Sequence, residues 1–285
     1  MKNKNKLRTF AVSMVMAATG LLIYCAGFYI KSYEQNLKAK AEYMEISEIA
    51  AADSASEPEA EQEDGTASAA KEQNKSADKK QKNRDNTDKI RESFGISWEN
   101  LRKINSRVVA WITIPGADIS YPVVQGNDDE YYLTHNFRRE EDLFGCIFLE
   151  HDNKKDFTDS HSIIYGHNME GNMMFANLNH YERPEFLEQC PEIEIITPER
   201  RFLYRIFSVE QASPESEAFR YGYRLLSRAY KQQLSVLKSN SMYETGTEPD
   251  AAAPMVTLFT CNSRLDKEIR MAVHGICYEI EEACY

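Results

Sequence analysis

Met255-Val256-Thr257-Leu258-Phe259-Thr260-Cys261 is a short apolar run of residues that favour β-strands, and it ends on a thiol. Other short runs rich in Val, Ile, Phe and Tyr share its character and are bounded by turn residues. The predicted strands cover residues 108–114, 119–124, 146–149, 162–165, 193–197, 202–209, 255–261 and 270–280. Because few of them alternate regularly with helices, the pattern predicts a mainly β fold, a barrel or sandwich carrying helices, rather than a doubly wound sheet.

Helical patterns interrupt these strands. The predicted helices cover residues 98–104, 128–134, 173–178, 184–190 and 223–237. Ser97 is a suitable N-cap for the first of them. The longest precedes the strand that ends at Cys261. The domain therefore combines a β core with a long helix placed before the thiol-bearing strand.

The N-terminal region is organised differently. Residues 10–30 carry no charge, and at about 1.5 Å per residue such a run can cross a hydrocarbon core of roughly 30 Å. Basic residues in positions 1–9 favour a cytoplasmic N-terminus. The alternative is a cleaved signal peptide, for which Ala39-Lys40-Ala41 has the small-x-small form, but this site lies beyond the apolar run and after charged residues. We expect an uncleaved single-pass anchor, and in either case an exported domain.

Residues 31–90 contain an acidic block over 42–64 and a basic block over 71–89, with few large apolar residues. This composition predicts a charged linker that is disordered or partly helical. Residues 91–285 have a globular composition and form one domain of ordinary size. The net charge of −11 argues against nucleic-acid binding.

Two residues give Cys261 a possible catalytic setting. His167 lies upstream in Ile163-Ile164-Tyr165-Gly166-His167, and Arg270 lies downstream. Histidine both accepts and donates protons near neutral pH, whereas arginine has no acceptor atom and is suited to hold an oxyanion. A lone cysteine at a strand end is more often a packed apolar residue. The combination nevertheless favours a cysteine acyl-transfer enzyme.

The remaining cysteines and histidines do not form a recognisable metal site. Cys25 falls in the predicted span, and the five cysteines outside it are an odd number, so two pairs would still leave one thiol over. Cys277 and Cys284 could pair, but a domain of this size does not need disulfides for stability, and we expect free thiols. The other histidines lack partners at ligand spacing, and the acidic groups at 128–129 and 140–142 are interpreted as solvated turns. No metal or other cofactor is expected.

The run Thr257-Leu258-Phe259-Thr260-Cys261 resembles the Thr-Leu-x-Thr-Cys nucleophile motif of the sortases, cysteine enzymes of Gram-positive cell surfaces. Further segments resemble those of class B sortases in the same order, over most of residues 95–280. They are residues 119–126 followed by Tyr131-Tyr132-Leu133, residues 145–149, and residues 163–169 followed by Met174-Phe175. An ordered series of matches is more specific than one pentapeptide.

The resemblance implies an eight-stranded sortase barrel, an N-terminal helical extension and a helix before a late strand. It implies that Cys261 attacks a Thr carbonyl of a C-terminal sorting signal and that the thioester is passed to an amine of peptidoglycan or of a pilin-like protein. His167 would move the proton and Arg270 would hold the oxyanion. The implied substrate-binding residues are Thr260, Tyr165, Leu133 and Phe219.

The chain departs from the family at two places. Ser263 stands where some class B members have an acidic residue, and Glu150-His151-Asp152-Asn153 replaces a common Asp-x-Arg-Asn pattern, so a local ion pair is expected to be rearranged. Two alternatives remain open from sequence: a hydrolytic cysteine peptidase using the same residues, and a non-catalytic surface-binding module.

Overall fold

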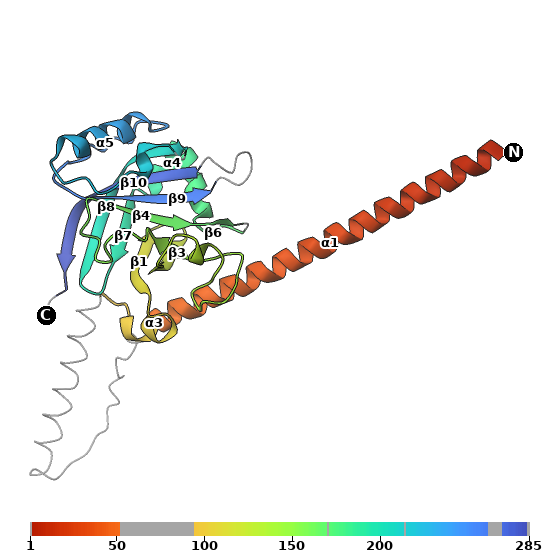
Figure 1. Cartoon of the computed structure of the whole chain (residues 1–285), viewed down its shortest axis with the longest axis horizontal. Helices are drawn as coiled ribbons and strands as arrows, with labels where there is room; N and C mark the ends of the chain where they lie inside the picture. Colours follow the sequence, from red (N-terminus) through yellow and green to blue (C-terminus); the bar gives the residue numbers. More distant parts are fainter. Residues whose placement is uncertain (1, 52–93, 170, 214, 262–269, 284–285) are drawn as a thin grey trace, which may run out of the picture. The chain divides into compact units, whose positions relative to one another are not determined.

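Eight strands close into a barrel in the part of the chain described by the computed structural model, which covers residues 2–51, 94–169, 171–213, 215–261 and 270–283 (Figure 1). Their spatial order is β1-β2-β3-β4-β9-β10-β8-β7, with β7 paired to β1. The barrel strands are β1 (Val108–Ile114), β2 (Ile119–Gln125), β3 (Ile147–Leu149), β4 (His161–Gly166), β7 (Glu192–Ile196), β8 (Arg200–Ala212), β9 (Met255–Cys261) and β10 (Arg270–Glu282). The predicted mainly β fold is confirmed.

Pairing in the barrel is mostly antiparallel, with two parallel exceptions. β2 runs parallel to β3, and β4 runs parallel to β9. A parallel pair requires a long crossover connection, and the chain between β4 and β9 supplies it with helices and two further barrel strands. This crossover places β4 directly beside the strand that ends at Cys261.

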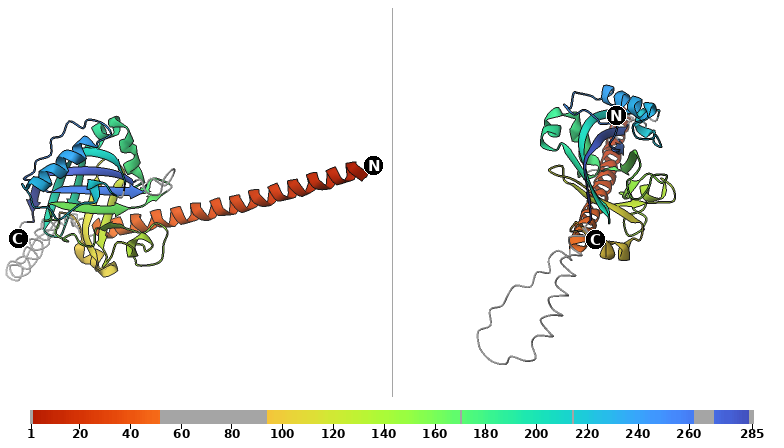
Figure 2. Two further views of the ribbon diagram at one scale, coloured as in Figure 1. Left: turned by 45° about the horizontal axis from the view of Figure 1, so that its top comes forward. Right: turned by 90° about the vertical axis from the view of Figure 1, so that its left-hand side faces the viewer.

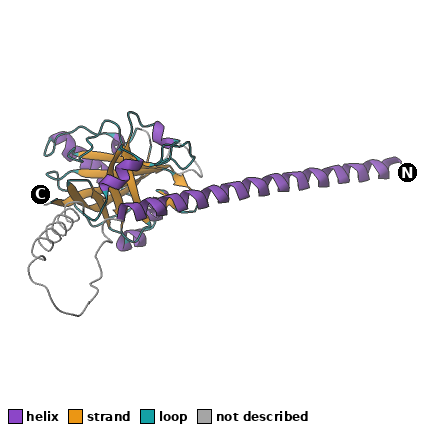
Figure 3. Ribbon diagram, turned by 90° about the horizontal axis from the view of Figure 1, so that it is seen from below, coloured by secondary structure: helices purple, strands orange, loops and turns teal. Residues whose placement is uncertain are grey.

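Short helices, purple in Figure 3, lie around the orange strands of the barrel, and two further strands form a separate two-stranded sheet. They are α3 (Trp98–Ile104), α4 (Pro184–Gln189), α5 (Arg228–Ser239), the 3₁₀ helices η1 (Tyr131–Leu133), η2 (Ala176–Glu182) and η3 (Glu217–Phe219), and the hairpin of β5 (Asn168–Met169) and β6 (Met173–Met174). α3 has the predicted bounds.

The long helix before the nucleophile strand is α5, which lies against the outside of the barrel (Figure 2). Ser227 caps it by accepting a hydrogen bond from the Tyr230 backbone amide at 3.2 Å. Its buried residues Tyr230, Leu234 and Leu237 belong to one apolar cluster with Phe259 of β9. The predicted helix over 223–237 therefore exists, but it begins later, at the serine cap.

Two predicted helices were wrong in part. Over 128–134 only η1 forms, because the Asp128 carboxylate accepts backbone amides of Glu130 and Tyr131 and makes a tight turn. Over 173–178 the chain first forms β6 and then η2. Asn172 and Met174 have φ of 58° and 56°, left-handed values that a continuous helix does not allow.

The chain divides into two compact units, residues 1–44 and 45–285. The helix α1 (Lys2–Ala51) covers the predicted span and part of the predicted linker, while residues 52–90 of the linker lie outside the described residues. Within the second unit, Ile46 and Ala50 are buried, and the carbonyl of Ala50 accepts the amide of Ser97 at 2.8 Å. A search of the described residues finds no helix whose length and apolar character would let it cross a membrane.

Candidate active site

Strand register brings the predicted catalytic positions to one edge of the barrel. Gly166, the last residue of β4, is the Cα partner of Thr260 on β9, and Cys261 is the Cα partner of Arg270 on β10. His167 follows Gly166 directly. Three neighbouring strands thus present Cys261, His167 and Arg270 at adjacent positions, which we call the active edge. The side chains of Cys261 and Ser263 lie outside the described residues.

Gly166 permits the close packing behind this edge. A Cβ at this position would lie 2.4 Å from Cδ1 of Ile147 and 2.7 Å from the ring of Phe175. Real Cβ atoms do not tolerate such distances in a packed core. A side chain here would therefore push β4 away from its neighbours, and His167 would move with it.

His167 is half-buried and held by one hydrogen bond. Its Nε2 atom lies 2.7 Å from the carbonyl oxygen of Leu133, at the end of η1. A carbonyl oxygen can only accept, so Nε2 carries the proton and donates it. In the neutral imidazole Nδ1 is then the nitrogen available for proton transfer. Leu133 is 38 % exposed, and the contact that links it to His167 is made by its backbone carbonyl.

Arg270 rests on aromatic rings. Its Cζ atom lies 5.9 Å from the ring centroid of Tyr165 and 5.6 Å from that of Phe219. Phe259 lies between these rings, 5.8 Å from Tyr165 and 4.1 Å from Phe219, with interplanar angles of 15° and 4°. We call Tyr165, Phe259 and Phe219 the aromatic column. Cation–π attraction over such distances holds the guanidinium at the active edge.

The other predicted substrate residues lie around this edge. Thr260 is buried, and among the described atoms its hydroxyl has no hydrogen-bond partner. Phe219 is partly buried against the cluster that contains α5, so it contributes to packing as well as to the aromatic column.

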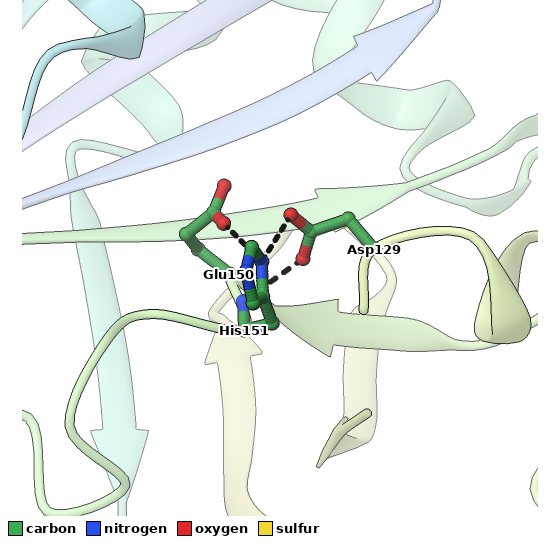
Figure 4. A group of neighbouring side chains, drawn as sticks. All are labelled: Asp129, Glu150 and His151. Atoms are coloured by element: carbon green, nitrogen blue, oxygen red, sulfur yellow. Dashed lines mark hydrogen bonds and ion pairs between the residues drawn. The ribbon is translucent and has the colours of Figure 1, made fainter. Parts of the chain in front are cut away.

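One polar group was missed as a functional feature by the sequence analysis (Figure 4). Tyr165 donates its hydroxyl to Glu150 at 2.8 Å, and the other oxygen of Glu150 lies 2.9 Å from Nδ1 of His151. His151 also pairs with Asp129 at 2.8 Å. A local ion pair is thus formed through His151, and the predicted rearrangement relative to the family stays a prediction. Asp129 takes part in this pair, whereas it was predicted to lie in a solvated turn.

Electrostatics in this group follow from burial. Glu150 is 5 % exposed. Burial raises the pKa of Glu150 to about 7, and the Asp129 carboxylate adds to the rise. Burial, followed by the charge of Glu150, raises the pKa of Tyr165 far above its usual range, so this phenol stays protonated and donates.

Asp129, Glu150 and His151 are also the group of described residues that could offer ligand atoms to a cation, since these atoms lie within 4.8 Å of one another. Their atoms are engaged with each other and with Tyr165. The arrangement is satisfied as an ion-pair and hydrogen-bond network, and the expectation that no metal is required stays a prediction.

A second polar group runs across the barrel wall away from the active edge, and we call His161, Thr257, His274 and Glu210 the buried polar chain. Nδ1 of His161 lies 2.6 Å from the carbonyl of Arg220, and its Nε2 lies 2.7 Å from the hydroxyl of Thr257. That hydroxyl lies 2.8 Å from Nδ1 of His274, whose Nε2 is at an ion-pair distance of 3.5 Å from Glu210. Burial lowers the pKa of His161 to about 3.

Three cysteines of the domain have the properties of structural thiols. Cys146, Cys190 and Cys277 are buried, Cys25 is exposed, and none of these four forms a disulfide in the described part of the chain. Burial raises the pKa of Cys277 to about 11, which leaves almost no thiolate at neutral pH. The absence of a disulfide agrees with the prediction for Cys146, Cys190 and Cys277, while Cys284 lies outside the described residues.

Comparison with known proteins extends these observations. Residues 112–276 match the sortase domain family. A curated relative, sortase B of Listeria monocytogenes, is 31% identical over 177 residues, covering 62% of this chain and 72% of that protein. The crystal structure of Clostridium perfringens sortase B has a TM-score of 0.60 and 30% identity, covering 64% of this chain and 100% of that one. The Staphylococcus aureus sortase B–substrate complex has a TM-score of 0.59 and 27% identity, covering 64% and 84%.

Proposed function

The chain belongs to the sortase family, in which it is a class B cysteine transpeptidase, and we propose that Cys261, His167 and Arg270 carry out its reaction. The observation that carries this proposal is the strand register, which makes Cys261 and Arg270 Cα partners and places His167 one residue beyond the partner of Thr260. A nucleophile, a proton carrier and an oxyanion donor are the groups that acyl transfer through a thioester requires.

Cys261 attacks, as thiolate, the carbonyl carbon of a Thr in the sorting signal. The new C–S bond gives a tetrahedral oxyanion, and the C–N bond then breaks. His167, which has taken the thiol proton of Cys261 on Nδ1, gives this proton to the departing amine, and a thioester remains. An incoming amine attacks the thioester, His167 takes up the proton of that amine, and the cysteine is released as thiolate. Nδ1 is the nitrogen of His167 that does this work, since Nε2 donates to the Leu133 carbonyl.

Arg270 holds the oxyanion of each tetrahedral intermediate. Loss of one such donor typically costs about 3–4 kcal/mol of transition-state stabilisation. The aromatic column supports this role, because its rings hold the guanidinium of Arg270 without neutralising the positive charge. Cys261 is the Cα partner of Arg270, so the charge is held next to the nucleophile strand.

Sortases act on sorting-signal substrates and amine acceptors at the cell surface. For this chain the proposed substrate contacts are made by Thr260, Tyr165, Leu133 and Phe219, and the proposed acceptor is an amine of peptidoglycan or of a pilin-like protein. Thr260 is supported by its buried hydroxyl without a partner among the described atoms, and Leu133 by its exposure next to His167.

The proposed localisation is a single-pass anchor over residues 10–30, with residues 1–9 cytoplasmic and the catalytic domain over 91–285 extracellular. It is supported by the uncharged sequence of 10–30 and by the exposed apolar side chains of Leu21, Ile23 and Phe28 on α1. The full chain should remain in the membrane fraction after alkaline carbonate extraction. Its release into the supernatant would contradict the anchor.

Incubation of the purified chain with a panel of sorting-signal peptides and amine acceptors tests the catalytic proposal. Wild type should yield the amine-linked product, and Cys261→Ala should abolish it. Cys146→Ala is the matched control, because this thiol is buried and should leave product formation unchanged. Hydrolysed acid as the only product would favour the peptidase alternative, and activity surviving in Cys261→Ala would refute the assignment of the nucleophile.

A further inference from the structure

The guanidinium of Arg270 is positioned by aromatic rings, so whatever fixes those rings fixes the guanidinium. It lies over Tyr165 and Phe219, the two outer members of the aromatic column. Phe219 is stacked at 4.1 Å on Phe259 of the nucleophile strand and is thereby held in place. Tyr165 lies farther from Phe259, at 5.8 Å, and needs additional support.

That support comes from the hydroxyl end of Tyr165. Its ring packs against Phe148 at 5.2 Å, and its hydroxyl donates to Oε2 of Glu150 at 2.8 Å. Packing confines the faces of the ring, whereas the hydrogen bond fixes the far end of the side chain. In its ionised form Glu150 accepts this bond as a carboxylate, which makes the bond stronger than one between neutral groups.

Glu150 is itself rigidly held. It follows β3 directly, and its backbone amide donates to Ile163 of β4 at 2.9 Å. Its backbone carbonyl accepts the side-chain amide of Gln125 at 2.9 Å, and its Oε1 lies 2.9 Å from Nδ1 of His151. Both carboxylate oxygens therefore have fixed partners, and the side chain is only 7% exposed.

A buried carboxylate is costly unless its hydrogen bonds repay the lost hydration. Here Oε2 of Glu150 accepts the hydroxyl of Tyr165, and the ring of Tyr165 lies under the guanidinium of Arg270. We propose that Glu150 is a positioning residue for Arg270, acting through Tyr165 without touching the substrate. This inference rests on the proposed function, in which Arg270 stabilises the oxyanion.

Kinetics of peptide cleavage with an amine acceptor provide the first test. Glu150→Ala should lower kcat about tenfold with KM changed less than about threefold, because a misplaced oxyanion donor weakens transition-state binding. Glu150→Gln keeps an oxygen acceptor for Tyr165 and should stay within about threefold of wild type.

Tyr165→Phe removes the same hydrogen bond while keeping the ring, and it replaces Glu150→Ala as the test variant if Glu150→Ala folds poorly. If both substitutions act through one contact, the double variant should be no slower than the slower single variant. Asp152→Asn is the matched control. This carboxylate also neighbours His151, at 3.4 Å, but it is exposed and bonds Tyr221 rather than Tyr165.

A readout that does not need activity is the Nε–H signal of Arg270 in ¹⁵N-labelled full-length protein, assigned with Arg270→Lys. Ring currents of Tyr165 and Phe219 displace this signal. Glu150→Ala should move it towards the value of a free arginine, while Glu150→Gln and Asp152→Asn should leave it in place.

The outcomes separate the inference from the proposed function. Wild type without transfer on any peptide would count against the function, and the Arg270 signal would still decide the inference. The inference would be overturned if Glu150→Ala and Tyr165→Phe both transferred as fast as wild type and the Arg270 signal did not move. The proposed function would then remain intact.

Discussion

His161 and His167 lie at opposite ends of the same short segment, and they differ in burial and in how many of their ring nitrogens are hydrogen-bonded. His161 opens β4, is fully buried and has both ring nitrogens engaged in the buried polar chain. His167 follows β4 at the active edge, is half-buried and has one ring nitrogen held by a carbonyl. Desolvation suppresses protonation of the first, whereas the second keeps a nitrogen for exchange. Burial, rather than residue type, separates the structural histidine from the proposed catalytic one.

The largest effect expected from this comparison is that of His167→Asn. Asparagine can still donate to the Leu133 carbonyl but cannot carry a proton, so kcat/KM for peptide transfer should fall about 10³-fold. The measurement is the initial rate of product formation at neutral pH. His180→Asn is the control, because His180 lies in η2 and makes an edge-on contact with the ring of Phe186. Equal activity of wild type and His167→Asn would remove His167 from the mechanism.

A smaller loss is expected for Arg270→Lys. Lysine keeps the positive charge but loses the planar fork that binds an oxyanion with two donors, so kcat should fall about 10²-fold. Arg205→Lys is a matched control, since Arg205 also lies over an aromatic ring, that of Tyr278 at 5.2 Å, but far along the sheet from Cys261. A similar loss in both variants would mean that the effect comes from the sheet and not from the active edge.

The smallest expected effect concerns His161, the buried histidine of the comparison, and it is a dependence of the free energy of unfolding on pH. The pKa of His161 is about 3 in the folded chain and about 6.5 in the unfolded chain, so the unfolded state binds more protons between these values. Its contribution to stability is complete above pH 6.5 and should decline by about 1.4 kcal/mol per pH unit as the pH falls towards 3.

Urea unfolding of the purified chain at pH 7, 6 and 5 measures this dependence. The groups facing His161 are the carbonyl of Arg220, the hydroxyl of Thr257, the amide of Gln233 and, across Thr257, His274. His161→Gln should be less stable at pH 7 and should show a flatter profile. An unchanged slope in this variant would show that another group governs acid unfolding.

Much of the active edge could be predicted from sequence because its parts are local. The strand ending at Cys261 and the strand before His167 are short runs rich in residues that favour β-strands, and β9 was predicted with its observed bounds. Two of the predicted helices were wrong in part, because single residues decided the local backbone. The Asp128 carboxylate accepts the backbone amide of Tyr131, so that only η1 forms there, and Met174 has a left-handed backbone and belongs to β6 where a helix was predicted.

The sequence by itself determined the class of chemistry, since a Thr-Leu-x-Thr-Cys run with a histidine and an arginine in order is local information. Only the tertiary structure decided that Arg270 is the Cα partner of Cys261, that Tyr165 and Phe219 carry its guanidinium, and that Glu150 holds Tyr165. Such contacts depend on strand register and burial, which bring together residues that lie far apart in the chain. No periodic pattern in the sequence reports them.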